Sequence, residues 1–212
     1  MKTFRAFTMI ELVFIIVVVG ILAAVAIPRI ERNGLIEAAD QLASHIRYTQ
    51  QLAMNDNKFS ATNANWHREG WRIEFNGNRY YIYSDADVSG TPQANEYAAD
   101  PMNPAKLLTS AGNGINATNR NSKLDLGATY SIANIVLGGS CAGQTHIMFD
   151  VKGRPMADNA NLYAGLYTTA CTITLTNQAG ETGIIFVQPE TGYVGATAAE
   201  SPNGDILYNL NS

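Results

Sequence analysis

The sequence lacks the short motifs that mark the common classes of enzyme. It contains no P-loop, no G-x-S-x-G nucleophile motif and no H-E-x-x-H zinc motif. Its three histidines, His45, His67 and His146, are far apart in the chain and show no spacing typical of metal ligands. These absences favour a protein that is not an enzyme.

Basic charge is also scarce. Charged residues make up 15% of the 212 residues, and the formal net charge is −4. Residues 189–212 contain neither lysine nor arginine. A nucleic-acid-binding protein usually presents a basic surface, because neutralising phosphates supplies much of its affinity. No nucleic-acid partner is therefore expected.

One long apolar run lies near the beginning of the chain. Residues 7–27 are apolar or small except for Thr8 and Glu11. As a helix this run would be about 32 Å long, which matches the roughly 30 Å core of a bilayer. A cleaved secretory signal has a shorter apolar core, so the run is expected to be retained as a transmembrane helix.

Glu11 is the unusual residue of this run. A carboxylate inside an apolar helix costs on the order of 2.5–3.5 kcal/mol on insertion scales and needs a partner. Two interpretations are open. Glu11 is either an interfacial residue at the helix end, close to Lys2 and Arg5, or it is paired with a group from another subunit.

The segment Arg5–Pro28, RAFTMIELVFIIVVVGILAAVAIP, resembles the N-terminal cleavage and methylation motif of type IV prepilins and type II secretion pseudopilins. In that family a prepilin peptidase removes a short basic leader, and the aromatic residue after the cut becomes the N-methylated N-terminus. The matching cut falls between Ala6 and Phe7, which makes residues 1–6 the leader. The family usually has glycine before the cut, and this chain has the small residue Ala6 there.

The resemblance also implies roles for three residues within the helix. Glu11 matches the family's membrane glutamate, and Gly20 and Pro28 match the glycine and proline that loosen its helix. In the family, the amine freed by cleavage pairs with this glutamate of a neighbouring subunit. A buried charge that is satisfied only between subunits penalises misaligned neighbours.

The resemblance therefore implies a structural subunit, minor or accessory, of a type II secretion pseudopilus or a type IV pilus. Its implied partners are other pilin or pseudopilin subunits, the prepilin peptidase and the inner-membrane assembly platform. Its implied location is the bacterial inner membrane, as a single-pass protein with residues 7–28 in the membrane and the head in the periplasm. Two alternatives remain: a minor pilin that binds DNA for uptake, and a membrane-tethered periplasmic binding domain.

The pattern changes twice after Pro28. Residues 29–55 carry apolar side chains at spacings of three and four, which is typical of an amphipathic helix. Residues 56–212 are instead rich in short β-type runs and turns. We expect an α+β fold in which one long N-terminal helix, half transmembrane and half amphipathic, packs on an antiparallel β-sheet head.

Within the head, three segments predict particular strands. The run WRIEFNGNRYYIY at residues 71–83 predicts a hairpin that turns at Asn76-Gly77-Asn78. Residues 145–150 predict one further strand, and residues 171–194 predict two or three antiparallel strands. Residues 85–129 show little periodicity and are expected to be an irregular surface.

The chain has two cysteines, Cys141 and Cys171. In an oxidising compartment they are expected to form a disulfide, which would close a loop of about thirty residues and contribute roughly 3–4 kcal/mol. The alternative is a pair of reduced cysteines in the core.

A loop of oxygen-bearing residues follows the predicted hairpin. Asp85, Asp87 and Ser89 alternate, Gly90 follows, and Glu96 closes a stretch of twelve. This spacing fits a calcium-binding loop, in which alternate oxygen ligands and a closing carboxylate surround the ion. Calcium is thus a possible cofactor, and the alternative is a turn rich in aspartate and glycine.

Overall fold

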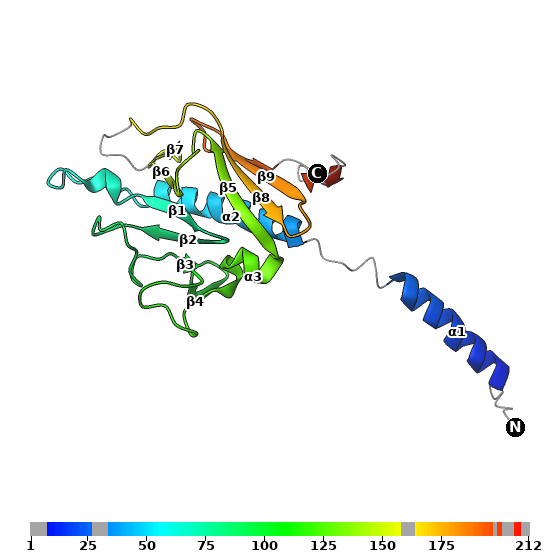
Figure 1. Ribbon diagram of the computed structural model, residues 1–212. Helices are drawn as coiled ribbons and strands as arrows, with labels where there is room; N and C mark the ends of the chain where they lie inside the picture. Colours follow the sequence, from blue (N-terminus) through cyan, green and yellow to red (C-terminus); the bar gives the residue numbers. More distant parts are fainter. Residues whose placement is uncertain (1–7, 27–33, 158–163, 197–198, 201–205, 209–212) are drawn as a thin grey trace, which may run out of the picture. The chain divides into compact units, whose positions relative to one another are not determined.

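The computed structural model describes residues 8–26, 34–157, 164–196, 199–200 and 206–208, and Figure 1 shows its ribbon. By its internal contacts the chain forms two compact units, Met1–Asn33 and Gly34–Ser212. The first unit contains one helix, and the second contains the rest of the described secondary structure.

The helix of the first unit is α1, which runs from Met9 to Ala26. Its 18 residues give a length of about 27 Å, less than the roughly 30 Å of a bilayer core. In the part of the chain that the structure describes, no helix is both long enough and apolar enough to cross a membrane. This finding contradicts the predicted transmembrane segment 7–28. The prediction of a single-pass inner-membrane protein with a periplasmic head is wrong.

The second unit begins with α2, Gly34–Asn55. Its apolar residues recur at every third or fourth position and form one buried face. The buried residues of α2 are Leu35, Ala38, Ala39, Leu42, Ala43, Ile46, Thr49 and Ala53. A Cβ atom on Gly34 would lie 2.8 Å from the backbone oxygen of Tyr130, so this residue must be glycine for the helix to start here. Residues 29–33 of the predicted helix lie outside the described residues.

A four-stranded antiparallel sheet has the order β2-β1-β6-β7. Its strands are β1 Trp71–Asn76, β2 Arg79–Ser84, β6 His146–Phe149 and β7 Pro155–Met156. β1 and β2 form the predicted hairpin, with Asn76 opposite Arg79. Gly77 lies in its tight turn with a φ of 59°, a conformation that favours glycine. The hairpin and the strand predicted at residues 145–150 are therefore confirmed.

A second antiparallel sheet has the order β12-β11-β9-β8-β5, and β10 also pairs with β9. Its strands are β5 Ile132–Gly139, β8 Cys171–Asn177, β9 Thr182–Val187, β10 Val194–Ala196, β11 Ala199–Glu200 and β12 Ile206–Tyr208. The strands predicted within residues 171–194 correspond to β8, β9 and the start of β10. β5 was not predicted, although it is the long strand that pairs with β8 along its whole length.

The segment between β2 and β5 is largely irregular, as expected, but it contains short elements. These are the paired strands β3 Ala99–Asp100 and β4 Asn103–Leu107, the 3₁₀ helix η3 Ser122–Leu124 and the helix α3 Leu126–Tyr130. Another 3₁₀ helix, η2 Trp66–Arg68, precedes β1. Leu108, Leu124 and Leu126 are fully buried and anchor this segment to the core. The segment thus contains a two-stranded sheet of its own, β3-β4, and a few buried apolar contacts hold it to the core.

The core lies where α2 packs against both sheets, and Figure 1 shows α2 running behind their strands. Leu42 and Ile46 at its centre are fully buried. The predicted arrangement, one long N-terminal helix packed on one antiparallel sheet, is wrong. Instead, α1 belongs to a separate unit, and α2 packs on a mostly β body that contains several sheets.

Candidate functional site

The N-terminal segment holds the residues that the family resemblance singled out. Ala6, Phe7 and Pro28 lie outside the described residues. Glu11 lies in the first turn of α1. Its carboxylate accepts hydrogen bonds from the backbone N–H and the hydroxyl of Thr8, both at 2.9 Å, and its own N–H donates to the Thr8 hydroxyl at 3.4 Å. Thr8 and Glu11 therefore form a capping box, which stabilises the start of the helix.

This capping contact corrects one expectation about Glu11. The sequence suggested no partner for the carboxylate beyond the flanking Lys2 and Arg5, but Thr8 supplies two hydrogen bonds. The signal was present in the sequence as threonine followed three residues later by glutamate. Two hydrogen bonds orient the carboxylate but leave its negative charge without a cationic partner among the described residues.

The surface of α1 is apolar in every direction. Its described large apolar side chains are all exposed: Met9, Ile10, Leu12, Val13, Phe14, Ile15, Ile16, Val17, Val18, Val19, Ile21 and Leu22. They occupy almost every successive position, so the helix has no polar face. A helix that is apolar all round is normally buried among other elements.

Gly20 interrupts this apolar surface within α1. A Cβ atom added at Gly20 would meet nothing within 4 Å. No described contact therefore requires glycine here, although glycine weakens a helix by about 1 kcal/mol relative to alanine. The role that the resemblance implies for Gly20 stays a prediction.

A second candidate site is the acidic loop, defined as residues 85–96. The structure brings together one ligand atom from each of Asp85, Asp87 and Glu96, all within 4.8 Å of one another. The hydroxyl of Ser89, the fourth predicted ligand, donates to the carbonyl of Thr91 at 3.2 Å. Asp85 and Glu96 are buried, whereas Asp87 is exposed.

Backbone N–H groups hold these carboxylates in place. Glu96 accepts from the N–H groups of Ala86 at 2.9 Å, Asp87 at 3.3 Å and Gln93 at 2.8 Å. Asp85 accepts from the N–H of Gly90 at 3.1 Å. The loop is therefore organised by its own acidic side chains, as expected of a turn rich in aspartate and glycine.

Arg72 is a cation that lies beside this loop. It is 2% exposed, its Nη1 lies 3.9 Å from Asp85 Oδ2, and it donates to the carbonyl of Arg68. Burial raises the pKa of Asp85, and Arg72 opposes this shift. Hydrogen bonding from Ser89 instead lowers the pKa of Asp87. Sequence reasoning missed this contact, although the predicted hairpin places Arg72 opposite Tyr83, close to where the loop begins.

The acidic loop fits a hard cation in part. Each carboxylate oxygen has two lone pairs, so the N–H contacts leave acceptor capacity on Asp85, Asp87 and Glu96. Three carboxylates and one arginine leave an excess of negative charge, which is the chemistry that Ca²⁺ prefers. Calcium at this loop, with Asp85, Asp87, Ser89 and Glu96 as its ligands, stays a prediction.

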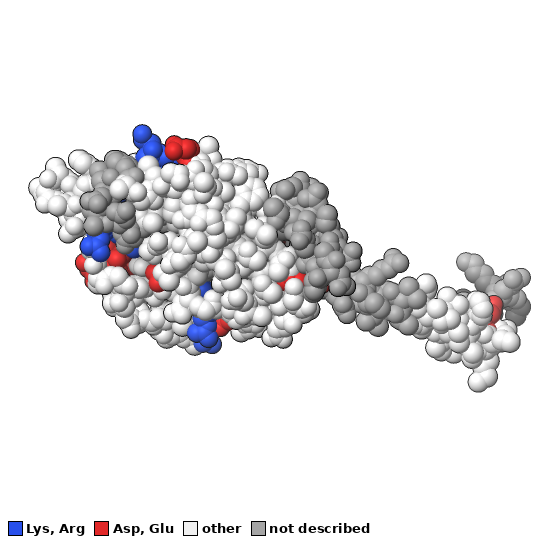
Figure 2. Space-filling model, turned by 45° about the horizontal axis from the view of Figure 1, so that its top comes forward, with Lys and Arg blue, Asp and Glu red and all other residues white. Residues whose placement is uncertain are grey.

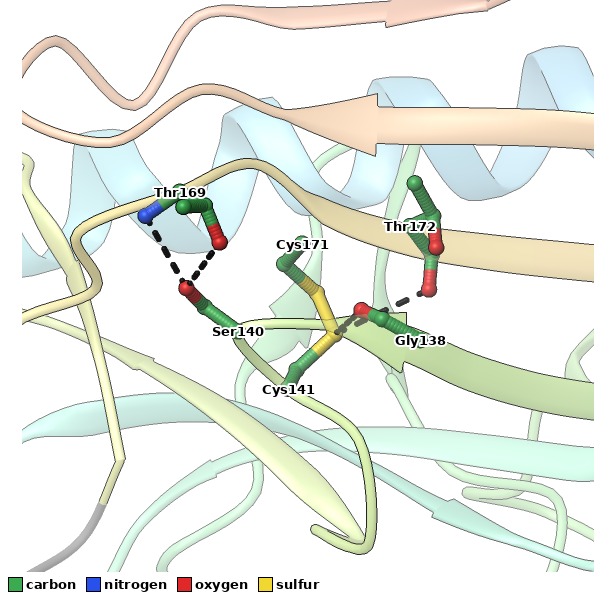
Figure 3. Close-up of a disulfide and its surroundings, with 6 residues drawn as sticks. All are labelled: Gly138, Ser140, Cys141, Thr169, Cys171 and Thr172. Atoms are coloured by element: carbon green, nitrogen blue, oxygen red, sulfur yellow. Dashed lines mark hydrogen bonds between the residues drawn. A yellow bond between two sulfur atoms is a disulfide. The ribbon is translucent and has the colours of Figure 1, made fainter.

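The disulfide between Cys141 and Cys171 is present, with a Cα–Cα distance of 5.1 Å. Figure 3 shows it linking the loop after β5 to the first residue of β8. Beside it, Ser140 and Thr169 share a hydrogen bond of 2.8 Å between their hydroxyl groups. Both cysteines are fully buried, so the bond closes one end of the β5–β8 pair.

Charged side chains of both signs are mixed on the surface of the head. On the face in Figure 2, basic side chains lie beside acidic ones in small groups, and no broad basic patch is visible among the described residues. Arg79, for example, pairs with Asp125 at 2.7 Å.

Comparisons with protein-family models, with curated proteins and with solved structures found no match.

Proposed function

We propose that this chain is a structural subunit, minor or accessory, of a type IV pilin-like filament: a type II secretion pseudopilus or a type IV pilus. A prepilin peptidase would cut between Ala6 and Phe7, and the subunits would then pack through their N-terminal helices. The observation that carries this proposal is the surface of α1, which is apolar on all sides and bears a carboxylate in its first turn.

The apolar surface of α1 argues for neighbours of the same kind. Exposed apolar area costs about 25 cal/mol per Å² when it faces water, and a large exposed apolar patch usually marks an interaction surface. A bundle of identical helices covers every side of each helix. The head would remain on the outside of such a bundle.

Glu11 would set the register of the bundle. Cleavage would free the amine of Phe7, which is a cation. The Phe7 amine of a neighbouring subunit would reach Glu11 at only one axial offset between the two helices. A misaligned neighbour leaves both charges unpaired in an apolar surrounding, which costs several kcal/mol. The other partners in this proposal are the prepilin peptidase and the machinery that assembles the filament.

Two variants separate the charge of Glu11 from its capping contact. Glu11→Gln removes the charge but keeps a side chain that completes a capping box. Thr8→Ala removes the cap, at about 1 kcal/mol, but keeps the charge. Each variant is co-expressed with the other proteins of a pilus or pseudopilus system. The filaments are then sheared from the cells and probed for this subunit.

We expect Glu11→Gln to reduce incorporation at least tenfold, because one misplaced buried charge costs more than 1.4 kcal/mol. Thr8→Ala should keep most of the incorporation. Equal incorporation of Glu11→Gln and the unaltered chain would contradict the register role. An equal loss of incorporation in both variants would show that Glu11 acts only as a helix cap.

A further inference from the structure

Two adjoining hollows lie beside the turn of the β1–β2 hairpin. Their volumes are about 420 and 360 Å³, within the range of roughly 300–1,000 Å³ that is usual for small-molecule sites. They share the lining residues Asn76, Tyr81 and Ala111, so they form one surface. We call this surface the hairpin groove.

Several polar side chains of the hairpin groove have no hydrogen-bond partner. The asparagine and serine residues that line it are Asn76, Asn78, Ser110 and Asn113. None of these four side chains makes a hydrogen bond within the part of the chain that the structure describes. Each amide has two donor hydrogens and an acceptor oxygen, and a hydroxyl both donates and accepts. The groove therefore presents unused donors and acceptors that carry no charge.

Tyr81 gives the groove a fixed aromatic surface, because it lines both hollows. Its ring packs edge-on against Tyr97, with 6.0 Å between the ring centroids. Its hydroxyl donates to Glu74 at 2.8 Å. The half-buried ring is thus held from two directions, and its accessible part offers apolar surface between the polar side chains.

The walls of the groove are also held by hydrogen bonds. On one side, the carbonyl of Asn78 accepts from the N–H of Leu126 at 2.9 Å, which fastens the hairpin turn to the start of α3. On the other side, the hydroxyl of Thr109 donates to the carbonyl of Ala111 at 2.6 Å. A ligand that enters a preformed groove does not have to order it, so more of the contact energy appears as affinity.

The charges and the backbone of this region limit the class of ligand. Among the lining residues, Arg79 is the only cation and Asp125 the only anion, and they pair at 2.7 Å. No unpaired charge in the lining therefore favours an ion. A peptide could not add as a strand to β2 at Ile82, because its N–H donates to Leu108 at 3.0 Å and its carbonyl accepts from Ala98 at 2.9 Å.

We propose that the hairpin groove binds a neutral oligosaccharide. Sugar hydroxyls both donate and accept hydrogen bonds, as do the unpartnered amides of Asn76, Asn78 and Asn113. The apolar C–H face of a sugar ring would pack on Tyr81. This glycan-binding role goes beyond the proposed filament function and does not depend on it, because the groove lies within one head.

A glycan array tests the ligand class. The full chain is kept in a detergent without a sugar head group, because such head groups would compete for the groove. The array carries neutral oligosaccharides together with sulfated forms of the same backbones. We expect binding to a subset of the neutral glycans and no gain in binding from sulfation. Isothermal titration calorimetry with the neutral glycan that binds best then gives the Kd.

Substitutions locate the binding site. Asn76→Ala should raise the Kd about two- to tenfold, the scale of one lost hydrogen bond. The matched control is Asn134→Ala, since Asn134 is also exposed and lies outside both hollows; its Kd should not change. Tyr81→Phe keeps the ring and should keep the affinity, whereas Tyr81→Leu removes the ring and should raise the Kd about fivefold.

Three results would overturn the proposal. Absence of binding to every neutral glycan would show that the groove is not a saccharide site. Stronger binding to the sulfated forms would indicate recognition of an anion instead. A Kd that is unchanged in both Asn76→Ala and Tyr81→Leu would place the binding elsewhere on the chain. Circular dichroism of each variant checks that the fold is intact, and none of these results bears on filament assembly.

Discussion

Reduction of the disulfide should destabilise the protein by a predictable amount. Cys141 and Cys171 are separated by 30 residues. In the chain-entropy model, opening a loop of this size releases about 3.6 kcal/mol of constraint in the unfolded chain. For a domain of this size each kcal/mol shifts the melting temperature by about 2–4 °C. The reduced protein should therefore melt roughly 7–14 °C lower.

The structure indicates that the folded state tolerates this reduction. Gly139 already pairs with Cys171 in the β5–β8 ladder, and six further register pairs continue from it. Backbone hydrogen bonds therefore keep the two cysteines close without the covalent bond. The effect should arise in the unfolded chain, so reduction changes the free energy of unfolding but leaves the native circular dichroism spectrum unchanged.

The assay is urea unfolding of the full chain, with and without a reductant that does not absorb at the wavelengths used. The variant Cys141→Ala/Cys171→Ala is the control, since reductant should have no effect on it. A loss below about 1 kcal/mol would refute the loop-entropy argument. Loss of the cooperative transition itself would show that the bond holds the native fold together.

Three other perturbations test separate contacts. Tyr80→Phe should cost about 1–3 kcal/mol in urea unfolding, because Gln41 and His45, at 2.8 and 2.6 Å from the fully buried Tyr80 hydroxyl, lose their partner. Burial lowers the pKa of His45, and Asp100 opposes this shift. Because folding favours the neutral imidazole, the free energy of unfolding should fall as the pH drops below about 6.5. His45→Gln should flatten this dependence of stability on pH. Calcium at about ten times its Kd should stabilise the fold by about 1.4 kcal/mol in a thermal melt, and Asp87→Asn should abolish the gain; equal melting temperatures with calcium and with chelator would exclude the site.

Local signals accounted for what the sequence predicted correctly. The Asn-Gly turn sets the register of β1 and β2 without help from the rest of the chain, and the apolar stripe of α2 follows from helix geometry alone. Such features depend on neighbours in sequence, so they can be read before any tertiary contact is known.

Sequence patterns did not predict which strands, distant in the chain, pair with each other. β5 was missed because its ladder is irregular between Ile132 and Asn134 and ends in Gly138 and Gly139, which breaks the alternation that marks a strand. The division into two sheets depends on which distant strands pair, and only the structure shows it. The contact of Arg72 with Asp85 likewise arises because β1 begins beside the end of β2, where the acidic loop starts.

The N-terminal helix shows the opposite error, in which a strong local pattern was extended too far. Continuous hydrophobicity and the family resemblance suggested one helix from residue 7 to residue 55. The described α1 is 18 residues long, and α2 belongs to another unit. Hydrophobicity indicates that a surface is covered, but it does not identify the molecule or element that covers it.

The proposed assembly role rests on cleavage before Phe7, and mass spectrometry of the mature N-terminus tests it most directly. The chain is expressed with a prepilin peptidase, purified and fragmented. We predict an N-methylated Phe7 as the first residue and the loss of residues 1–6. An intact Met1 in cells that contain active peptidase would contradict the proposal that this chain is a pilin-like subunit.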